Sequence, residues 1–154
     1  MAKDENILLL VGDGEHARLV RFVPGKGLHT ERELTSEAAH KRDTDLVSDR
    51  PGASFHSDAT AHHALSPRHD PHEQAKQEFA HLVARELNAL ARAGSMDTLV
   101  IVAPDHVLHD IRAALEPEAA GRVAGTLGKD LVKTPDHELW PHVQQWVPAV
   151  HRPA

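Results

Sequence analysis

The pattern of apolar and polar side chains predicts that the domain begins with three antiparallel strands. Residues 7–11 form a continuous apolar run, typical of a buried strand, and Gly12-Asp13-Gly14 favours a turn after it. Apolar side chains recur through residues 17–23, and residues 28–34 alternate between apolar and polar. The turn sequence Pro24-Gly25-Lys26-Gly27 joins these two segments, so we expect strands that follow one another in hairpins.

A long amphipathic helix is predicted from Pro71 to about Gly94. Asp70 is suited to the N-cap, proline is favoured at the first helical position, and Glu73 completes a capping box. Apolar residues then repeat at spacings of three and four and form one face, which should be buried. They are Phe79, Leu82, Val83, Leu87 and Leu90.

A central strand and a second helix are expected after this long helix. Residues 98–103 are apolar without alternation, as in a strand covered on both faces, so Val100 should be buried. Pro104-Asp105 begins the second helix, with the aspartate acting as an ordinary helix cap.

The last part of the chain predicts one more strand and one more helix. Residues 122–127 form a weaker strand, and a helical segment from Thr134 contains Pro141, which should kink or reset it. Trp140 and Trp146 in this segment are interpreted as core or dimer contacts. The order β-β-β-α-β-α-β-α predicts a single α/β domain over residues 1–154, with a mixed sheet of the RNase H-like kind.

Residues 36–66 show neither helical nor strand periodicity. Their few large apolar side chains are Leu46, Val47, Phe55 and Leu65, which cannot offset the entropy of ordering so much backbone. Long loops inside a compact domain are usually functional or disordered. We expect this loop to be mobile or to be ordered by a partner.

The composition narrows the function classes. The 154 residues include no cysteine, which excludes disulfides, thiolate catalysis and cysteine-ligated metals. A net charge of −6 does not indicate general nucleic-acid affinity, although a local basic site is compatible with it. The short apolar run near the N-terminus is below the length of a membrane span, so a soluble, cytoplasmic protein is expected.

Several motifs resemble the bacterial host attachment family. These motifs are Asp49-Arg-Pro-Gly-Ala-Ser-Phe55, Asp70-Pro-His-Glu-Gln74, Leu99-Val-Ile-Val-Ala-Pro104 and Lys129-Asp130-Leu131, and together they span most of the chain. The family is similar in turn to the central domain of eukaryotic-type class 1 release factors, in which three strands lead into an extended loop and a long helix. That resemblance implies a translation-associated role with the ribosome or transfer RNA as partner.

The sequence also departs from both patterns. It has no Gly-Gly-Gln tripeptide, so the peptidyl-tRNA hydrolysis of release factors does not carry over. It has Phe55-His56-Ser57 where the family usually has Phe-Asp-Ser, and His62-His63-Ala64 where the family has Arg-His-Ala. The candidate RNA- or partner-binding residues are Asp49, Arg50, Phe55, Ser57, His63, Arg68, Asp70 and Gln74.

Two enzymatic alternatives rest on metal-binding side chains. Asp13 and Asp105 follow strands that are parallel neighbours in RNase H-like folds, where paired carboxylates hold the divalent cations of nucleases. The loop also contains His56, His62 and His63, which would be the ligands if zinc or nickel bound there. Because adjacent histidines do not easily converge on one ion, we expect no metal and no other cofactor.

The leading hypothesis is a non-catalytic RNA- or ribosome-binding domain that presents residues 49–74. The alternative is a metal-dependent hydrolase or nuclease that uses Asp13, Asp105 or the loop histidines. A third hypothesis takes the family name literally, as a factor that affects surface attachment. A homodimer is a further prediction, and no membrane partner is expected.

Overall fold

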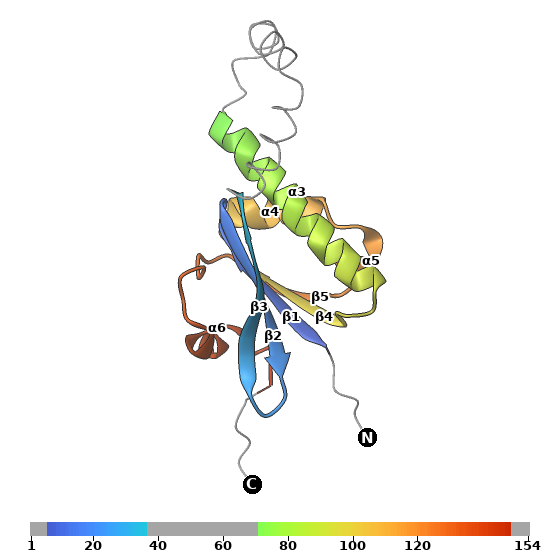
Figure 1. Ribbon diagram of the computed structural model, residues 1–154, viewed down its shortest axis with the longest axis vertical. Coiled ribbons are helices and arrows are strands. Elements are labelled where there is room, and N and C mark those ends of the chain that lie inside the picture. Colours follow the sequence, from blue (N-terminus) through green and yellow to red (C-terminus); the bar gives the residue numbers. More distant parts are fainter. Residues whose placement is uncertain (1–5, 37–70, 149–154) are drawn as a thin grey trace, which may run out of the picture.

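The computed structural model describes residues 6–36 and 71–148, which form an open five-stranded sheet with helices on both faces (Figure 1). The strands lie in the order β3-β2-β1-β4-β5. Their bounds are β1 Ile7–Gly12, β2 His16–Val23, β3 Gly27–Thr35, β4 Thr98–Val102 and β5 Val123–Leu127. The predicted loop at residues 36–66 lies, apart from Ser36, outside the described residues.

The pairing of the strands confirms the predicted α/β class with a mixed sheet. The strands β1, β2 and β3 pair antiparallel in sequence, whereas β1–β4 and β4–β5 are parallel. Val100 is fully buried, as a central strand requires. The weaker strand signal is also confirmed, because β5 occupies residues predicted to be extended.

The long helix, α3, runs from Pro71 to Arg92, close to the predicted bounds. Gly94 ends it with φ +74, a backbone conformation that glycine adopts without strain. Leu87 is fully buried on its inner face. The second helix, α4, spans Asp105–Ala113.

The C-terminal part differs from its prediction. A four-residue helix, α5 (Pro117–Ala120), precedes β5, and the expected last helix is broken into η1 (Asp136–Glu138) and α6 (Trp140–Val143). Pro141 lies in the first turn of α6, where its missing N–H needs no partner, so it resets the helix rather than kinking it. We call residues 131–147 the strap.

Two apolar clusters lie on opposite faces of the sheet. The helical face packs α3 and α4 on side chains such as Leu8, Leu19 and Ile101. The strap covers the other face with Leu131, Leu139, Val143 and Val147. In Figure 1, α6 and the connection to it lie on the side of the sheet away from α3. Within residues 6–36 and 71–148, no helix is long and apolar enough to cross a membrane.

Candidate functional site

The three parallel strands end at one edge of the sheet, and the predicted carboxylates lie there. Val11 of β1 is paired with Val102 of β4, so the residues after both strands emerge at the same level. In open α/β sheets, ligands bind outside the carboxyl ends of such strands. Asp13 and Asp105 therefore share this edge, as the sequence predicts.

Asp13 is already used by the turn between β1 and β2. Its Oδ1 accepts hydrogen bonds from the backbone N–H groups of Glu15 at 2.8 Å and His16 at 2.7 Å. The imidazole of His16 lies 3.8 Å from the same carboxylate oxygen. These contacts are the ordinary chemistry of an aspartate in a turn and stabilise the β1–β2 hairpin.

Asp105 does not cap α4, and that prediction was wrong. Pro104 occupies the N-cap position and Asp105 is the first helical residue, with no side-chain cap hydrogen bond. Its carboxylate instead lies against Gly128, at a place where a Cβ on residue 128 would collide with Oδ1. Within the described ranges 6–36 and 71–148, no group of three or more His, Asp or Glu side chains is placed to hold a metal ion.

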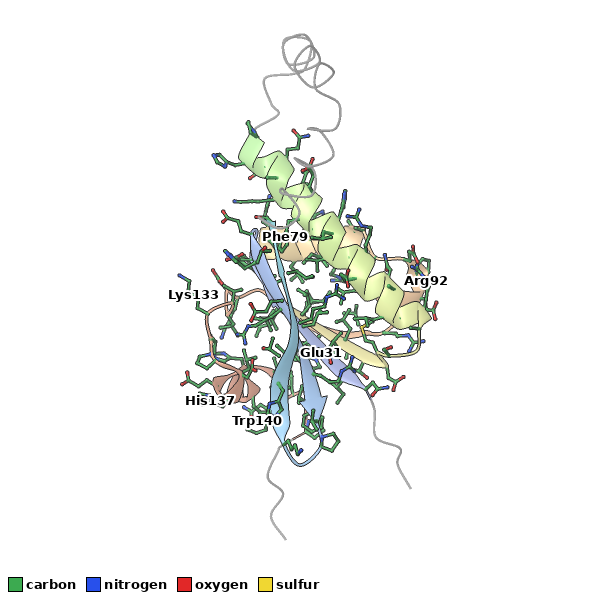
Figure 2. All side chains as sticks on the ribbon, in the orientation of Figure 1. Glu31, Phe79, Arg92, Lys133, His137 and Trp140 are labelled. Carbon is green, nitrogen blue, oxygen red and sulfur yellow. The ribbon has the colours of Figure 1, made fainter. Side chains whose placement is uncertain are left out.

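The first two turns of α3 project beyond the sheet at this edge (Figure 2). None of the eight side chains of residues 71–78 is buried, and Phe79, only 2% exposed, is the first to enter the core. The projecting end is braced at two points. The aliphatic stem of Lys76 packs on Gly14, and Oε1 of Glu73 lies 3.1 Å from Nε2 of His106 in α4.

This projecting end adjoins the predicted binding segment. Gln74 is exposed on it, and is the one residue of the candidate set within the described part of the chain. The other members of that set, and the alternative metal ligands, lie outside the described residues; they are Asp49, Arg50, Phe55, Ser57, His63, Arg68 and Asp70, and His56 and His62. The strand β3 also ends at this edge, where the N–H of Ser36 donates to the carbonyl of Glu15 at 2.8 Å.

A cleft of about 530 Å³ with both polar and apolar lining opens on the other face, between β2, β3 and the strap. Arg18, with 11% of its side chain exposed, lies at the centre of a hydrogen-bond network there. Its guanidinium donates to Oδ1 of Asp136 at 2.6 Å and to the carbonyls of Leu131 and Thr134. The N–H and hydroxyl of Thr30 donate to the same carboxylate at 2.7 and 2.6 Å.

This network holds the strap on the sheet, because it joins two strands to a segment more than one hundred residues away in sequence. Burial raises the pKa of Asp136, but the two hydrogen bonds from Thr30 and the charges of Arg18 and His29 outweigh it and lower the pKa overall. The pattern of the sequence does not predict this network. The one local signal for the network is Arg18, a charged residue between apolar neighbours in β2. Val20 and Phe22, at alternate positions of the same strand, face the strap.

A family model described as "Protein required for attachment to host cells" matches residues 8–143. The chain belongs to this family. The matched residues run from β1 to the end of α6 and include α3 and most of the strap. No curated protein matches the chain.

Two solved structures are similar to this family member. One is the crystal structure of the archaeal translation termination factor aRF1, at 16% identity and a TM-score of 0.48, covering 82% of this chain and 32% of that one. The other is described as an archaeal protein, at 10% identity and a TM-score of 0.48, covering 94% of this chain and 35% of that one. The chain therefore spans about a third of the length of either structure, and these similarities concern the fold.

Proposed function

We propose that the protein is a non-catalytic, translation-associated binding protein that presents residues 49–74 to ribosomal or transfer RNA. The observation that carries this proposal is the uncovered end of α3. A helix whose first eight residues bury no side chain offers them for contact, and Gln74 lies among them. Lys76 contacts Gly14 and Glu73 contacts His106, so this end is connected to the β1–β2 turn and to α4.

The contacts of the Asp13 and Asp105 carboxylates favour a binding protein over a metal-dependent hydrolase. A two-metal site needs aspartate oxygens that are free to coordinate cations. Asp13 instead gives one oxygen to two backbone N–H groups, and Asp105 lies against the backbone at Gly128. The resemblance of the sequence to the central domain of class 1 release factors points to a partner in translation, and this role implies a cytoplasmic location.

Phosphate contact on a chain with a net charge of −6 must come from a few local side chains. We assign it to Arg50 and Arg68, with Phe55 stacking on an unpaired base. The binding constant should then fall with salt only modestly, with a log–log slope of about −2 for two neutralised phosphates.

Sedimentation of the full chain with ribosomes through a sucrose cushion tests the proposal. The unsubstituted protein should pellet with ribosomes, and the Arg50→Ala/Arg68→Ala variant should bind at least about a hundredfold more weakly, since each of the two charge-assisted contacts contributes about 1.5–3 kcal/mol. The matched control is Arg92→Ala, which removes an exposed arginine from the far end of α3 and should change nothing.

Protein that stays in the supernatant with ribosomes and with separated subunits, and that does not retard transfer RNA in a native gel, contradicts the proposal. A divalent-metal-dependent nuclease activity that is lost in both Asp13→Asn and Asp105→Asn would instead establish the hydrolase alternative.

A further inference from the structure

The two halves of the strap differ in what holds them on the sheet. The second half contributes three buried side chains to the core, Leu139, Val143 and Val147. The first half, residues 131–138, contributes only Leu131, and its other side chains are exposed or partly exposed. We call residues 131–138 the flap. Because segments with few buried apolar contacts open locally at the lowest free energy, the flap is the part of the strap most able to leave the sheet.

Polar contacts replace apolar packing in the flap. Arg18 of β2 donates to Oδ1 of Asp136 and to two carbonyls of the flap. Thr30 of β3 donates its N–H and its hydroxyl to the same carboxylate. Water can replace the partners of the carboxylate, the carbonyls and Thr30 when the flap lifts. The guanidinium decides the cost of opening, because a charge left largely buried and unpaired is strongly unfavourable.

The flap is built to move as one piece. The N–H of Thr134 donates to the carbonyl of Leu131, and that of Glu138 donates to the carbonyl of Pro135, both at 2.9 Å. These hydrogen bonds lie within the flap, so lifting does not break them. The exposed residues 128–130 connect the flap to β5 and can absorb the change in backbone angles.

Glu33 of β3 is a second carboxylate within reach of Arg18. The two residues are directly opposite each other in the β2–β3 register, and both line the cleft. The Cβ atoms of directly opposite residues lie about 4.5–5.5 Å apart, so these two long side chains can meet on the same face of the sheet. Glu33 is exposed, and no ion pair in the described part of the chain involves it.

The observed position leaves the guanidinium of Arg18 incompletely paired. Its hydrogen bonds are all made by Nη1 and Nη2. Within residues 6–36 and 71–148, its Nε is the one buried side-chain nitrogen or oxygen without a hydrogen-bond partner. Such a donor is unfavourable. A carboxylate can accept two parallel hydrogen bonds from a guanidinium, so Glu33 could satisfy the atom that Asp136 leaves unpaired.

We propose that Arg18 is a two-position latch, which pairs with Asp136 when the flap is closed and with Glu33 when the flap is lifted. Because the exchange of carboxylates keeps the guanidinium paired in both states, the flap opens without global unfolding. Opening uncovers Arg18 and Thr30 in the floor of the cleft, so the flap is a movable cover of this cleft. The second half of the strap stays on the sheet through its buried side chains.

The backbone amide of Thr30 reports the opening, because its N–H donates to Oδ2 of Asp136 at 2.7 Å. Hydrogen exchange of single amides is measured by NMR on the full chain, under conditions where the rate reflects the opening equilibrium. Thr30 should exchange faster than the amides of the central strand β1, which exchange only on global unfolding.

Glu33→Gln separates the latch from a purely structural role, because it removes a partner of the lifted state alone. It should slow the exchange of Thr30 by about two- to fivefold, since an exposed ion pair changes an equilibrium by up to about fivefold. A residue that only stabilises the fold would do the opposite and speed the exchange when it is replaced. Glu78→Gln is the matched control, because it removes the same charge from an exposed position of α3 and should change nothing.

A double-mutant comparison tests whether Glu33 acts through Arg18. In the Arg18→Met background the latch is absent, so Glu33→Gln should no longer slow the exchange of Thr30. Equal slowing in both backgrounds overturns the proposal. An exchange rate that Glu33→Gln leaves unchanged or raises in the otherwise unsubstituted chain overturns it too. The same holds if Thr30 exchanges no faster than β1, because the flap would then open only when the protein unfolds.

Discussion

One face of the sheet is covered by α3 and α4, and the other by the strap, whose two helices are only three and four residues long. The helices satisfy most of their backbone hydrogen bonds internally and pack through apolar side chains. The strap has too little helix to satisfy its backbone groups in this way. The guanidinium of Arg18 in β2 therefore donates hydrogen bonds to the carbonyls of Leu131 and Thr134. The irregular covering segment thus depends on a largely buried polar anchor from the sheet, whereas the polar contact from the sheet to α3, between Arg32 and Glu86, is partly exposed.

The helical face has polar contacts of its own, among them the partly exposed ion pair between Arg32 of β3 and Glu86 of α3, with 2.7 Å from Nη1 to Oε1. Asn88 of α3 is 6% exposed and accepts the N–H of Glu116 at 2.8 Å, which fixes the connection between α4 and α5. It holds that connection rather than α3 itself. The covering of this face therefore depends on close packing, and that of the strap face on packing together with the Arg18 network.

The two faces should differ most in the unfolding free energy that is lost when one fully buried leucine on each face is truncated to alanine. Leu87→Ala should destabilise the protein by about 4 kcal/mol, because α3 cannot collapse into the cavity. Leu139→Ala should cost about 2–3 kcal/mol, since the irregular strap can shift to fill the space. Urea unfolding measures both, and a larger cost for Leu139→Ala would contradict the comparison.

The next effect concerns the anchor of the strap. Arg18→Met should cost about 3 kcal/mol, because two strap carbonyls lose their guanidinium donor and the partly buried carboxylate of Asp136 loses its opposite charge, keeping only the hydrogen bonds from Thr30. Hydrogen exchange should rise over residues 131–147 and not over α3. Uniform exchange throughout the chain would show that the network does not hold the strap specifically.

An exposed arginine gives the matched control for that substitution. Arg92 pairs with Glu116 on the helical face, and both side chains are more than half exposed. Solvent screens such pairs, so Arg92→Ala should change the unfolding free energy by less than about 1 kcal/mol.

A smaller effect is the pH dependence of the same anchor. The pKa of Asp136 is lowered by its hydrogen bonds and by Arg18, so its contribution to stability is complete above the ordinary aspartate pKa of about 3.9 and is lost as the pH falls through the lower folded value. The stability difference between the unsubstituted protein and Asp136→Asn should therefore be constant at pH 5–7 and shrink below about pH 4.

The exposed carboxylate of Glu33 provides the control, because no ion pair in the described part of the chain involves it. Glu33→Gln should leave the unfolding free energy nearly unchanged across the same pH range. A difference for Asp136→Asn that is flat down to pH 3 would mean that the carboxylate is not held in its charged form.

The helical face could be predicted from the sequence, and the strap could not. The three- and four-residue spacing from Phe79 to Leu90 is a local pattern, and so are the apolar runs of β1 and β4. Arg18 and Asp136 are separated by 118 residues, and neither spacing nor composition indicates their contact. The candidate site was predicted in part, since Asp13 and Asp105 do share an edge of the sheet. The contacts of their carboxylates could not be predicted, because they depend on the geometry of the β1–β2 turn and on the close approach of Gly128.

Hydrogen exchange of the full chain with and without ribosomes tests the proposed function most directly. The projecting end of α3 and the segment before it form the proposed contact surface, so exchange should slow within residues 49–78 when ribosomes are added. The strap should be unaffected. Protection centred on the strap, or no protection near Gln74 at saturating ribosome concentration, would contradict the proposal.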